Sequence, residues 1–384
     1  MGDVAVLAGQ LIECASVCPK DEGAQEIIAN RLKDAGFEVE HLRVDGIRSL
    51  YASFGTDGPL FAFSGHSDVV PAGNLEEWTS PPFEAHVRGG NLFGRGAIDM
   101  KGPMAASVIA GVRFASRWQA KDLPFRVAFM IAGDEEVMSN HGTKDLLALI
   151  ESRGDKVRHC VVTESTSHEV LGDMVKIGRR GSIVGQITVK GIQGHSAYPH
   201  LASNPISKAL PLLASLDNED WGAGTEGFPA TSFQWTNLQA GTGAANVIPG
   251  ELFGMFNMRF SPDLTVQMIK ERVEERLQSF GLDYQIKWSC DAFPFKTEEG
   301  VLSQIVSESV YSKTGLRPEL STTGGTSDAR FIAPSGAEVI ELGTLSRMCH
   351  QIDEHVAIAD LDQLALIYED ILDRFAAHYG SSNQ

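Results

Sequence analysis

Four short apolar runs, separated by segments with helical periodicity, constrain the fold of this chain most strongly. They read GPLFAFSG, FRVAFMIAG, HCVVTES and AEVIELG. Continuous apolar runs of this length are typical of strands buried on both faces, and helices between them allow the strands to lie parallel. Helical patterns occur in EGAQEIIANRLKDAGF and GPMAASVIAGVRFAS. We therefore expect an α/β domain with a mostly parallel sheet flanked by helices.

The middle of the chain follows a different pattern. The segments SIVGQITVKG, NPISKALPLLASLD, TSFQWTNLQAG, ELFGMFNMRFS, DLTVQMIKERVEERLQSFG and YQIKWSC read as strand, helix, strand, strand, helix and strand. This βαββαβ order is that of a ferredoxin-like unit. Since 384 residues exceed what one core usually supports, we expect residues 180–293 to form a domain inserted into another domain made of residues 1–179 and 294–384.

Composition and charge narrow the class of protein. The formal charge of −18 argues against a nucleic-acid or anionic membrane partner, because phosphate binding needs clustered Lys and Arg. No segment approaches the roughly 20 apolar residues of a membrane helix, and the first residues lack the basic start of a signal peptide. Five scattered cysteines favour reduced thiols over a disulfide framework. We expect a cytoplasmic protein.

Residue types that bind metal ions follow the apolar runs. The carboxyl ends of parallel strands meet at one edge of a sheet, where α/β proteins bind ligands. The segment GRGAIDMKG, rich in glycine, places a further carboxylate just before a helix. The residues concerned are His66, Asp68, Asp99, Asp134, Glu135, Glu136, Glu164 and His350.

A hydrolytic site with two metal ions needs a carboxylate that bridges both ions, further ligands on each, and a base near the shared water. The ligand count is met by His66, Asp99, Glu136, Glu164 and His350, with Asp99 best suited to bridge. This leaves Glu135 to carry protons between water and a leaving nitrogen.

Each of these residues could also have a structural role that involves no metal ion. Asp68 could support the second imidazole nitrogen of His66, but a buried His66 could itself be a purely structural, hydrogen-bonded histidine. Three acids after a strand often begin a helix, and Glu164 could cap a helix or form an ion pair. Asp134 is expected to be structural.

Nine motifs, in order from about residue 5 to 375, resemble the M20 family of dinuclear zinc amidohydrolases. They are SGHSDVVPAG, LFGRGAIDMKGP, GDEE, GRRGS, GHSAYPHLASNP, AGTGAANVIPGE, FNMRFS, LSTTGGTSDARFI and CHQIDEHV. Within the family they are most similar to desuccinylases that act on N-succinyl-LL-2,6-diaminopimelate. The resemblance implies hydrolysis of this N-acyl amino acid to succinate and the free diamine.

The resemblance also assigns roles to the metal ligands. One Zn²⁺ would be held by His66 and Glu164 and the other by Glu136 and His350, with Asp99 bridging and a neighbouring glutamate, Glu135, as general acid and base. Because the ligands are rich in oxygen, Co²⁺ or Mn²⁺ could substitute at one of the two sites.

Further roles concern the inserted domain and the substrate. The family has a lid at this place and dimerises through it, so the resemblance implies a homodimer in which His195 reaches the partner's active site and stabilises an oxyanion. Arginines would recognise carboxylates of the substrate. The positions similar to substrate contacts are Arg179, Ser182, Arg259, Gly325, Thr326 and Ser346.

Several positions near the expected site depart from the desuccinylase pattern. Ser346 replaces an asparagine, Thr344 and Ser165 each replace a proline, and Arg347 adds a cation. No metal ligand is lost, but the pocket could differ. Two alternatives therefore stay open: a related enzyme for another N-acyl amino acid or specialised metabolite, and a non-catalytic protein that binds metal.

Overall fold

The computed structural model describes residues 2–137 and 139–381 and divides into two compact units. Unit 1 comprises the described parts of residues 1–178, 297–321 and 327–384, and unit 2 comprises residues 179–296 and 322–326. The inserted segment expected from the sequence, 180–293, lies within the first stretch of unit 2. The short return of residues 322–326 to unit 2 was not foreseen.

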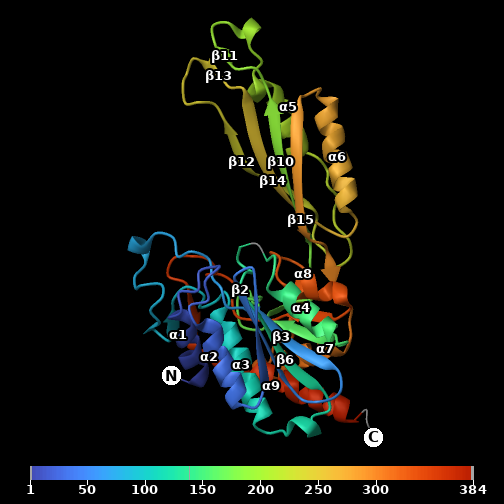
Figure 1. The fold of residues 1–384 in the computed structure, drawn as a ribbon. Coiled ribbons are helices and arrows are strands. Elements are labelled where there is room, and N and C mark those ends of the chain that lie inside the picture. Colours follow the sequence, from blue (N-terminus) through green and yellow to red (C-terminus); the bar gives the residue numbers. More distant parts are fainter. Residues whose placement is uncertain (1, 138, 382–384) are drawn as a thin grey trace. The chain divides into compact units, whose positions relative to one another are not determined.

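An eight-stranded sheet forms the centre of unit 1 (Figure 1), in the order β1-β2-β6-β3-β7-β18-β8-β17. The apolar runs form β6, β3, β7 and β18, which are neighbours and parallel. This confirms the predicted large, mostly parallel sheet. The strands are β1 Glu38–Val44, β2 Ile47–Phe54, β3 Leu60–His66, β6 Arg126–Ala132, β7 Val157–Val162, β8 Met174–Lys176, β17 Glu319–Ser321 and β18 Glu338–Glu341.

One edge of this sheet is an antiparallel hairpin of β1 and β2. Its two central residues, Asp45 and Gly46, have φ angles of 48° and 89°, which a two-residue hairpin turn of the favoured type requires. A separate three-stranded sheet contains β4 His86–Arg88, β5 Asn91–Phe93 and β19 His355–Ala357. Two short strands, β9 Gly178–Arg179 and β16 Phe295–Lys296, pair with each other.

Helices complete unit 1 and bury the sheet. Helix α3 packs closely because it is rich in small residues: a Cβ atom at Gly111 would lie 2.6 Å from Cζ of Phe129 on β6. Phe61, Phe63 and Phe375 extend the same core. The helices are α1 Asp3–Ile12, α2 Ala24–Asp34, α3 Lys101–Ala115, α4 Thr143–Ser152, α7 Val301–Thr314, α8 Ala329–Ile332 and α9 Ile358–Ser381, with short 3-10 turns at Leu75–Glu77, Ala120–Asp122 and Ala333–Ser335.

Unit 2 contains an antiparallel four-stranded sheet in the order β12-β14-β10-β15. Residues alternate between buried and partly buried along β10, because one face packs against helices. Side chains of Asn204 and Thr265 cap the two helices. The elements are β10 Gly181–Lys190, β11 Gly194–His195, the 3-10 turn Pro199–Leu201, α5 Pro205–Asp217, β12 Ser232–Ala240, β13 Val247–Ile248, β14 Glu251–Phe260, α6 Val266–Ser279 and β15 Tyr284–Ala292.

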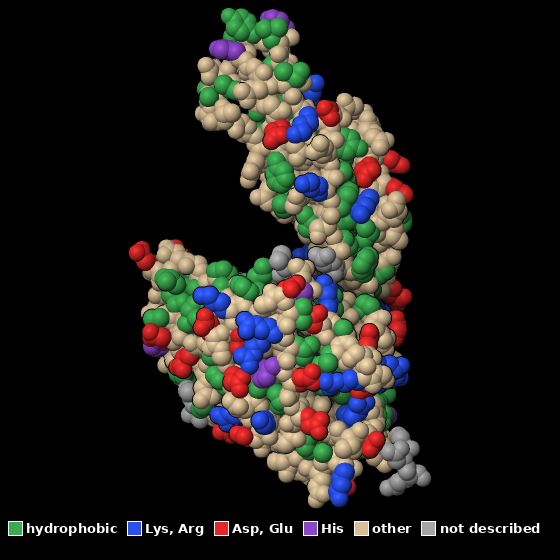
Figure 2. All heavy atoms as spheres, in the orientation of Figure 1, with side chains coloured by type: hydrophobic (Ala, Val, Ile, Leu, Met, Phe, Trp, Pro, Cys, Tyr) green, Lys and Arg blue, Asp and Glu red, His purple; other side chains and the backbone are tan. Residues whose placement is uncertain are grey.

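The surface carries both signs of charge. Figure 2 shows Asp and Glu side chains interspersed with Lys and Arg on the visible face of unit 1. In unit 2, large apolar side chains reach the solvent around β11 and at the adjoining 3-10 turn, where Ile192 is 61% and Leu201 69% exposed. Within residues 2–137 and 139–381, every helix is too short or too polar to cross a bilayer.

Candidate metal centre and active site

The structure brings together all five residues that the sequence predicts as metal ligands, at the carboxyl edge of the sheet in unit 1. His66 ends β3, Glu136 follows β6 and Glu164 follows β7. Asp99 lies in the loop before α3, and His350 lies in a loop between β18 and β19. Each of five separate segments therefore contributes one predicted ligand, as parallel strands allow.

Asp99 lies between the two imidazoles. Its Oδ1 is 3.2 Å from Nε2 of His66, and its Oδ2 is 3.2 Å from Nε2 of His350. Oε1 of Glu164 lies 3.8 Å from the His66 nitrogen, and Oε1 of Glu136 lies 3.2 Å from the His350 nitrogen. Each imidazole thus meets Asp99 and one glutamate, which are the two groupings expected for two ions.

Glu135 belongs to the same cluster. Ligand atoms of His66, Glu135 and Glu164 lie within 4.8 Å of one another, as do those of His66, Asp99 and Glu136. Glu135 and Glu136 are adjacent in the chain, yet each belongs to a different group of three. The sequence expectation that one of these acids binds metal while the other stays close is compatible with this geometry.

The pKa values of these residues reflect the crowding of carboxylates. Burial raises the pKa of Glu135 to about 8, and nearby negative charges add to the effect. Burial and the charge of Asp99 raise the pKa of Glu164 well above its usual range. Contact with Asp99 and Glu136 raises the pKa of His350 to about 10. The site therefore favours bound positive charge, which a protonated imidazole can supply only in part.

A metal ion would also satisfy a buried nitrogen of the cluster, Nε2 of His66, which is one of several buried polar atoms without a hydrogen-bond partner in the described residues. Nε2 of His66 is inaccessible to solvent and has no hydrogen-bond partner of suitable geometry in the part of the chain that the structure describes. Its other nitrogen, Nδ1, lies 2.9 Å from the main-chain carbonyl of Asp68. This contact leaves Nε2 directed at the carboxylates of Asp99 and Glu164, where a metal ion could take the place of its proton.

The carboxylate of Asp68 was expected to support the imidazole of His66, but it accepts hydrogen bonds from the main chain instead. Its oxygens accept hydrogen bonds from the main-chain nitrogens of Glu135 at 3.3 Å and Glu136 at 3.1 Å, whereas His66 Nδ1 lies 3.7 Å from the nearer carboxylate oxygen. Asp68 thus supports the imidazole through its carbonyl and the two glutamates through its side chain. Burial raises the pKa of Asp68 to about 6.

Two other acids, Asp134 and Asp328, are buried but are not among the predicted ligands. Asp134 is buried, and its Oδ2 accepts a hydrogen bond from the nitrogen of His141 at 3.0 Å, so it shapes the loop before α4 as a structural residue. Asp328 was not predicted as part of the site. It is buried, accepts a bond from Thr143 Oγ1 at 2.7 Å, and its charge helps to raise the pKa of Glu135. Only its place in the motif LSTTGGTSDARFI marked it in the sequence.

The predicted substrate contacts fall in both units. Ser182 and Arg259 are opposite each other on β10 and β14, and Arg179 donates a hydrogen bond from Nη1 to the carbonyl of Thr323 at 2.7 Å. Five of these residues, Arg179, Ser182, Arg259, Gly325 and Thr326, belong to unit 2, whereas Ser346 is exposed in unit 1.

His195 is exposed on β11 in unit 2. Its Nδ1 accepts a hydrogen bond from the nitrogen of Ala197 at 3.0 Å. In a neutral ring the proton is then on Nε2, which is available as a donor.

Three positions that depart from the desuccinylase pattern form hydrogen bonds with nearby residues: Ser165, Thr344 and Arg347. Ser165 Oγ lies 3.2 Å from Thr344 Oγ1, so two residues found where prolines were expected form a hydrogen bond. The added cation, Arg347, donates from Nε to the carbonyl of His168 at 3.1 Å and from Nη2 to the carboxylate of Glu169. Its charge is therefore paired within the loop that follows Glu164.

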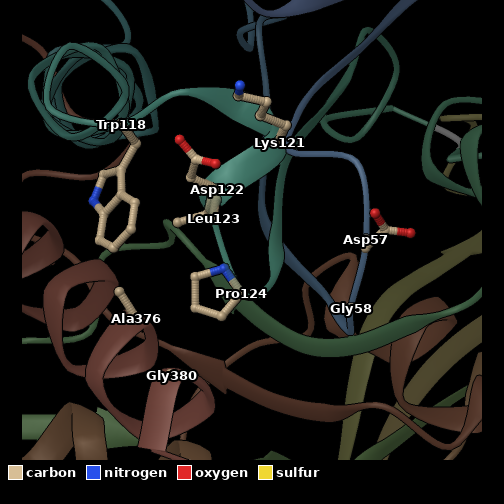
Figure 3. Close-up of a pocket in the computed structure, with 9 residues that line it drawn as sticks. All are labelled: Asp57, Gly58, Trp118, Lys121, Asp122, Leu123, Pro124, Ala376 and Gly380. Carbon is tan, nitrogen blue, oxygen red and sulfur yellow. The ribbon is translucent and has the colours of Figure 1, made fainter. Parts of the chain in front are cut away.

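A cavity of about 660 Å³ opens elsewhere in unit 1 (Figure 3). Gly58 precedes β3 and Pro124 precedes β6, so the cavity lies at the amino ends of these strands, at the opposite edge from the predicted metal ligands. Its lining carries charges of both signs and is separate from the candidate site. The lining residues are Asp57, Gly58, Trp118, Lys121, Asp122, Leu123, Pro124, Ala376 and Gly380.

Comparison with known proteins agrees with the fold and identifies similar sequences. A succinyl-diaminopimelate desuccinylase of Thioalkalivibrio sulfidiphilus is 50% identical over 97% of this chain and 99% of its own length. One from Acinetobacter baylyi is 48% identical over 98% and 99%. An M20 family metallo-carboxypeptidase from Sulfolobus solfataricus shares the fold with a TM-score of 0.83 at 17% identity, covering 98% of this chain and 100% of that one.

A family model described as peptidase family M20/M25/M40 matches residues 62–374. This range includes all five residues clustered around Asp99. The chain belongs to peptidase family M20/M25/M40.

Proposed function

We propose that this protein hydrolyses N-succinyl-LL-2,6-diaminopimelate at its amide bond and releases succinate and LL-2,6-diaminopimelate, a precursor of lysine and peptidoglycan. The proposal is supported by the desuccinylases that are 48–50% identical across nearly their whole length. The observation that carries it is the carboxylate of Asp99, whose oxygens lie 3.2 Å from the imidazoles of both His66 and His350.

Two divalent cations would be held by the side chains around Asp99. His66 and Glu164 would hold one, Glu136 and His350 would hold the other, and Asp99 would bridge them. Zn²⁺ suits a set of imidazole and carboxylate ligands, and Co²⁺ or Mn²⁺ could substitute at one site. When bound, the ions would polarise the amide carbonyl and make water a stronger nucleophile.

Glu135 would take a proton from the attacking water and deliver it to the leaving nitrogen. This role needs a carboxylate that is held close to the ligands without being one of them. Hydrogen bonding of its main-chain nitrogen to Asp68 restricts where Glu135 can lie.

Unit 2 would act as a ferredoxin-like lid and as the contact between two subunits in the cytoplasm. Its exposed apolar residues, including Ile192, Leu201 and Leu238, would be covered in a homodimer. His195 would then donate from Nε2 to the oxyanion in the partner's site, since its Nδ1 already accepts a bond from Ala197.

A mixing experiment tests this role of His195. His195→Asn and Glu135→Gln should each be nearly inactive, yet a mixture of the two should recover activity, because one site of the mixed dimer has both residues intact. Absence of recovery in a mixture shown to contain mixed dimers, by co-purification of differently tagged subunits, would exclude a contribution from the partner subunit.

Substrate carboxylates would be recognised by Arg179 and Arg259, whose guanidinium groups can each form paired hydrogen bonds. Ser182, Gly325, Thr326 and Ser346 would supply further polar contacts. Arg347 is not assigned to the substrate, because Glu169 pairs with it.

A hydrolysis panel tests the substrate. The purified protein, loaded with Zn²⁺, is assayed with N-succinyl-LL-2,6-diaminopimelate and with other N-succinyl and N-acetyl amino acids, and the released primary amine is measured. We expect the highest kcat/KM for the diaminopimelate derivative. A higher value for another N-acyl amino acid would favour the alternative of a related amidohydrolase, which the contacts of Thr344 and Arg347 would then help to explain.

A further inference from the structure

A buried ion pair links the segment that carries Asp99 to the turn that carries His350. Nη1 of Arg95 lies 2.7 Å from Oε2 of Glu354, and the two side chains are 2% and 0% exposed. Neither residue belongs to the proposed ligand set or to the proposed catalytic residues. Burying two charges is costly unless further hydrogen bonds satisfy them, so the partners of each side chain are informative.

The carboxylate of Glu354 holds the backbone around Asp99. Oε2 accepts a hydrogen bond from the nitrogen of Gly96 at 3.0 Å in addition to the one from Arg95. Oε1 accepts bonds from the nitrogens of Ile98 at 2.8 Å and Asp99 at 3.1 Å. One carboxylate thus receives four donors, three of which are main-chain groups of the loop that presents Asp99.

The guanidinium group of Arg95 holds the turn that carries His350. Its Nη1 donates to the carbonyl of Gln351 at 3.2 Å, and its Nη2 donates to the carbonyls of His350 at 3.5 Å and Pro71 at 3.4 Å. His350 has a φ of 61°, a conformation that is uncommon for residues other than glycine and needs support from its surroundings. Bonds to the carbonyls of His350 and Gln351 provide that support at the metal-binding turn.

These contacts form one continuous connection between two proposed ligands. It runs from the nitrogen of Asp99 to Glu354, then to Arg95, and then to the carbonyl of His350. The side chains at its ends meet at 3.2 Å between Asp99 Oδ2 and His350 Nε2. The ion pair is neutral as a whole, so it adds no net charge to a cluster that already contains many carboxylates.

We propose that Arg95 and Glu354 are positioning residues that fix the distance between Asp99 and His350, and so set the affinity of the metal position that these two ligands share. The proposal rests on the two-metal centre of the proposed function and adds residues that control it. Residues that orient metal ligands typically change affinity or activity about 10–100-fold when they are replaced. A merely structural ion pair would instead lower stability and leave the relative affinity of the two metal positions unchanged.

The test uses the full chain, freed of metal by a chelator and titrated with Co²⁺ alone. Calorimetry gives the affinity of each equivalent, and visible absorbance reports the coordination of the ion. For Glu354→Gln and Arg95→Lys we expect one of the two equivalents to bind about 10–100-fold more weakly with an altered spectrum. The other equivalent, which shares only Asp99 with the affected position, should weaken much less, and excess Co²⁺ should restore much of the lost kcat.

Arg126→Lys is the matched control. Arg126 forms a two-pronged ion pair with Asp155 at the amino end of β6, away from the ligands, so its replacement should leave both Co²⁺ affinities unchanged. If Glu354→Gln does not fold, Arg95→Lys decides the matter, because lysine keeps the charge but has a single nitrogen and cannot reach both Glu354 and the carbonyl of His350.

Each result has a distinct meaning. Wild-type affinity for both equivalents in the folded variants would overturn the positioning role and leave the proposed function standing. An equal loss at both metal positions would also overturn it. Failure of the wild-type protein to bind two equivalents would remove the metal centre itself. Because no substrate is present, the binding result is independent of which N-acyl amino acid the enzyme hydrolyses.

Discussion

Replacing Glu135 with glutamine should remove activity and increase the stability of the metal-free protein. Glutamine has the shape of a protonated glutamate but cannot accept or release a proton. Loss of a general acid and base typically lowers kcat by about 10²–10⁴, which corresponds to roughly 3–5 kcal/mol of transition-state stabilisation. The proposed ligands remain, so the metal content should not change.

The gain in stability follows from the buried charge. Glu135 has a pKa of about 8 in the folded protein against 4.5 for an ordinary glutamate. The folded state therefore keeps the proton that the unfolded state releases, and stability falls as the pH rises from about 4.5 to 8. At 1.36 kcal/mol per pKa unit, the full loss is about 5 kcal/mol as an upper limit. Glutamine does not ionise and avoids this loss.

Both effects are measured on the same two proteins. Denaturant unfolding of metal-free wild-type and Glu135→Gln proteins at pH 5 and pH 8 should give a difference in stability that is small at pH 5 and favours the variant at pH 8. Steady-state assays of the Zn²⁺-loaded proteins, with metal content measured by atomic absorption, give kcat. Near-native kcat at full metal content would refute the proton-carrying role, and equal stability at pH 8 would refute the electrostatic argument.

Other changes test the remaining parts of the site. His350→Ala should reduce the bound metal from two equivalents to one and abolish turnover; two tightly bound equivalents by atomic absorption would contradict the ligand assignment. Asp68→Asn should lower kcat about 10–100-fold in steady-state assays, because an amide oxygen can replace only one of the two carboxylate oxygens that accept bonds from Glu135 and Glu136. An unchanged kcat would contradict the idea that Asp68 positions these two glutamates. Removing metal with a chelator should lower the Tm measured by calorimetry. A free Zn²⁺ concentration 100-fold above its Kd should then restore about 2.7 kcal/mol of stability. A Tm that does not respond would exclude a strongly bound ion.

The core of the sheet could be predicted because its central strands contain short apolar runs. All seven residues of β3 are buried, which leaves a continuous hydrophobic run in the sequence. The edge strand β1 has no fully buried residue, so the hairpin with β2 had no comparable signal and was not predicted. The return of residues 322–326 to unit 2 depends on contacts with distant segments, which local patterns do not report.

The sequence alone identified the residue types at the carboxyl ends of the strands, and hence the cluster of His66, Asp99, Glu136, Glu164 and His350. Only the tertiary structure decided which atoms meet. It turned the Asp68 carboxylate toward two main-chain nitrogens, paired Arg347 with Glu169, and joined Arg95 to Glu354 across more than 250 residues of chain. The presence of buried strands follows from hydrophobic patterns that extend over many residues. Each hydrogen bond instead depends on distances of a few tenths of an ångström between segments that are remote in sequence.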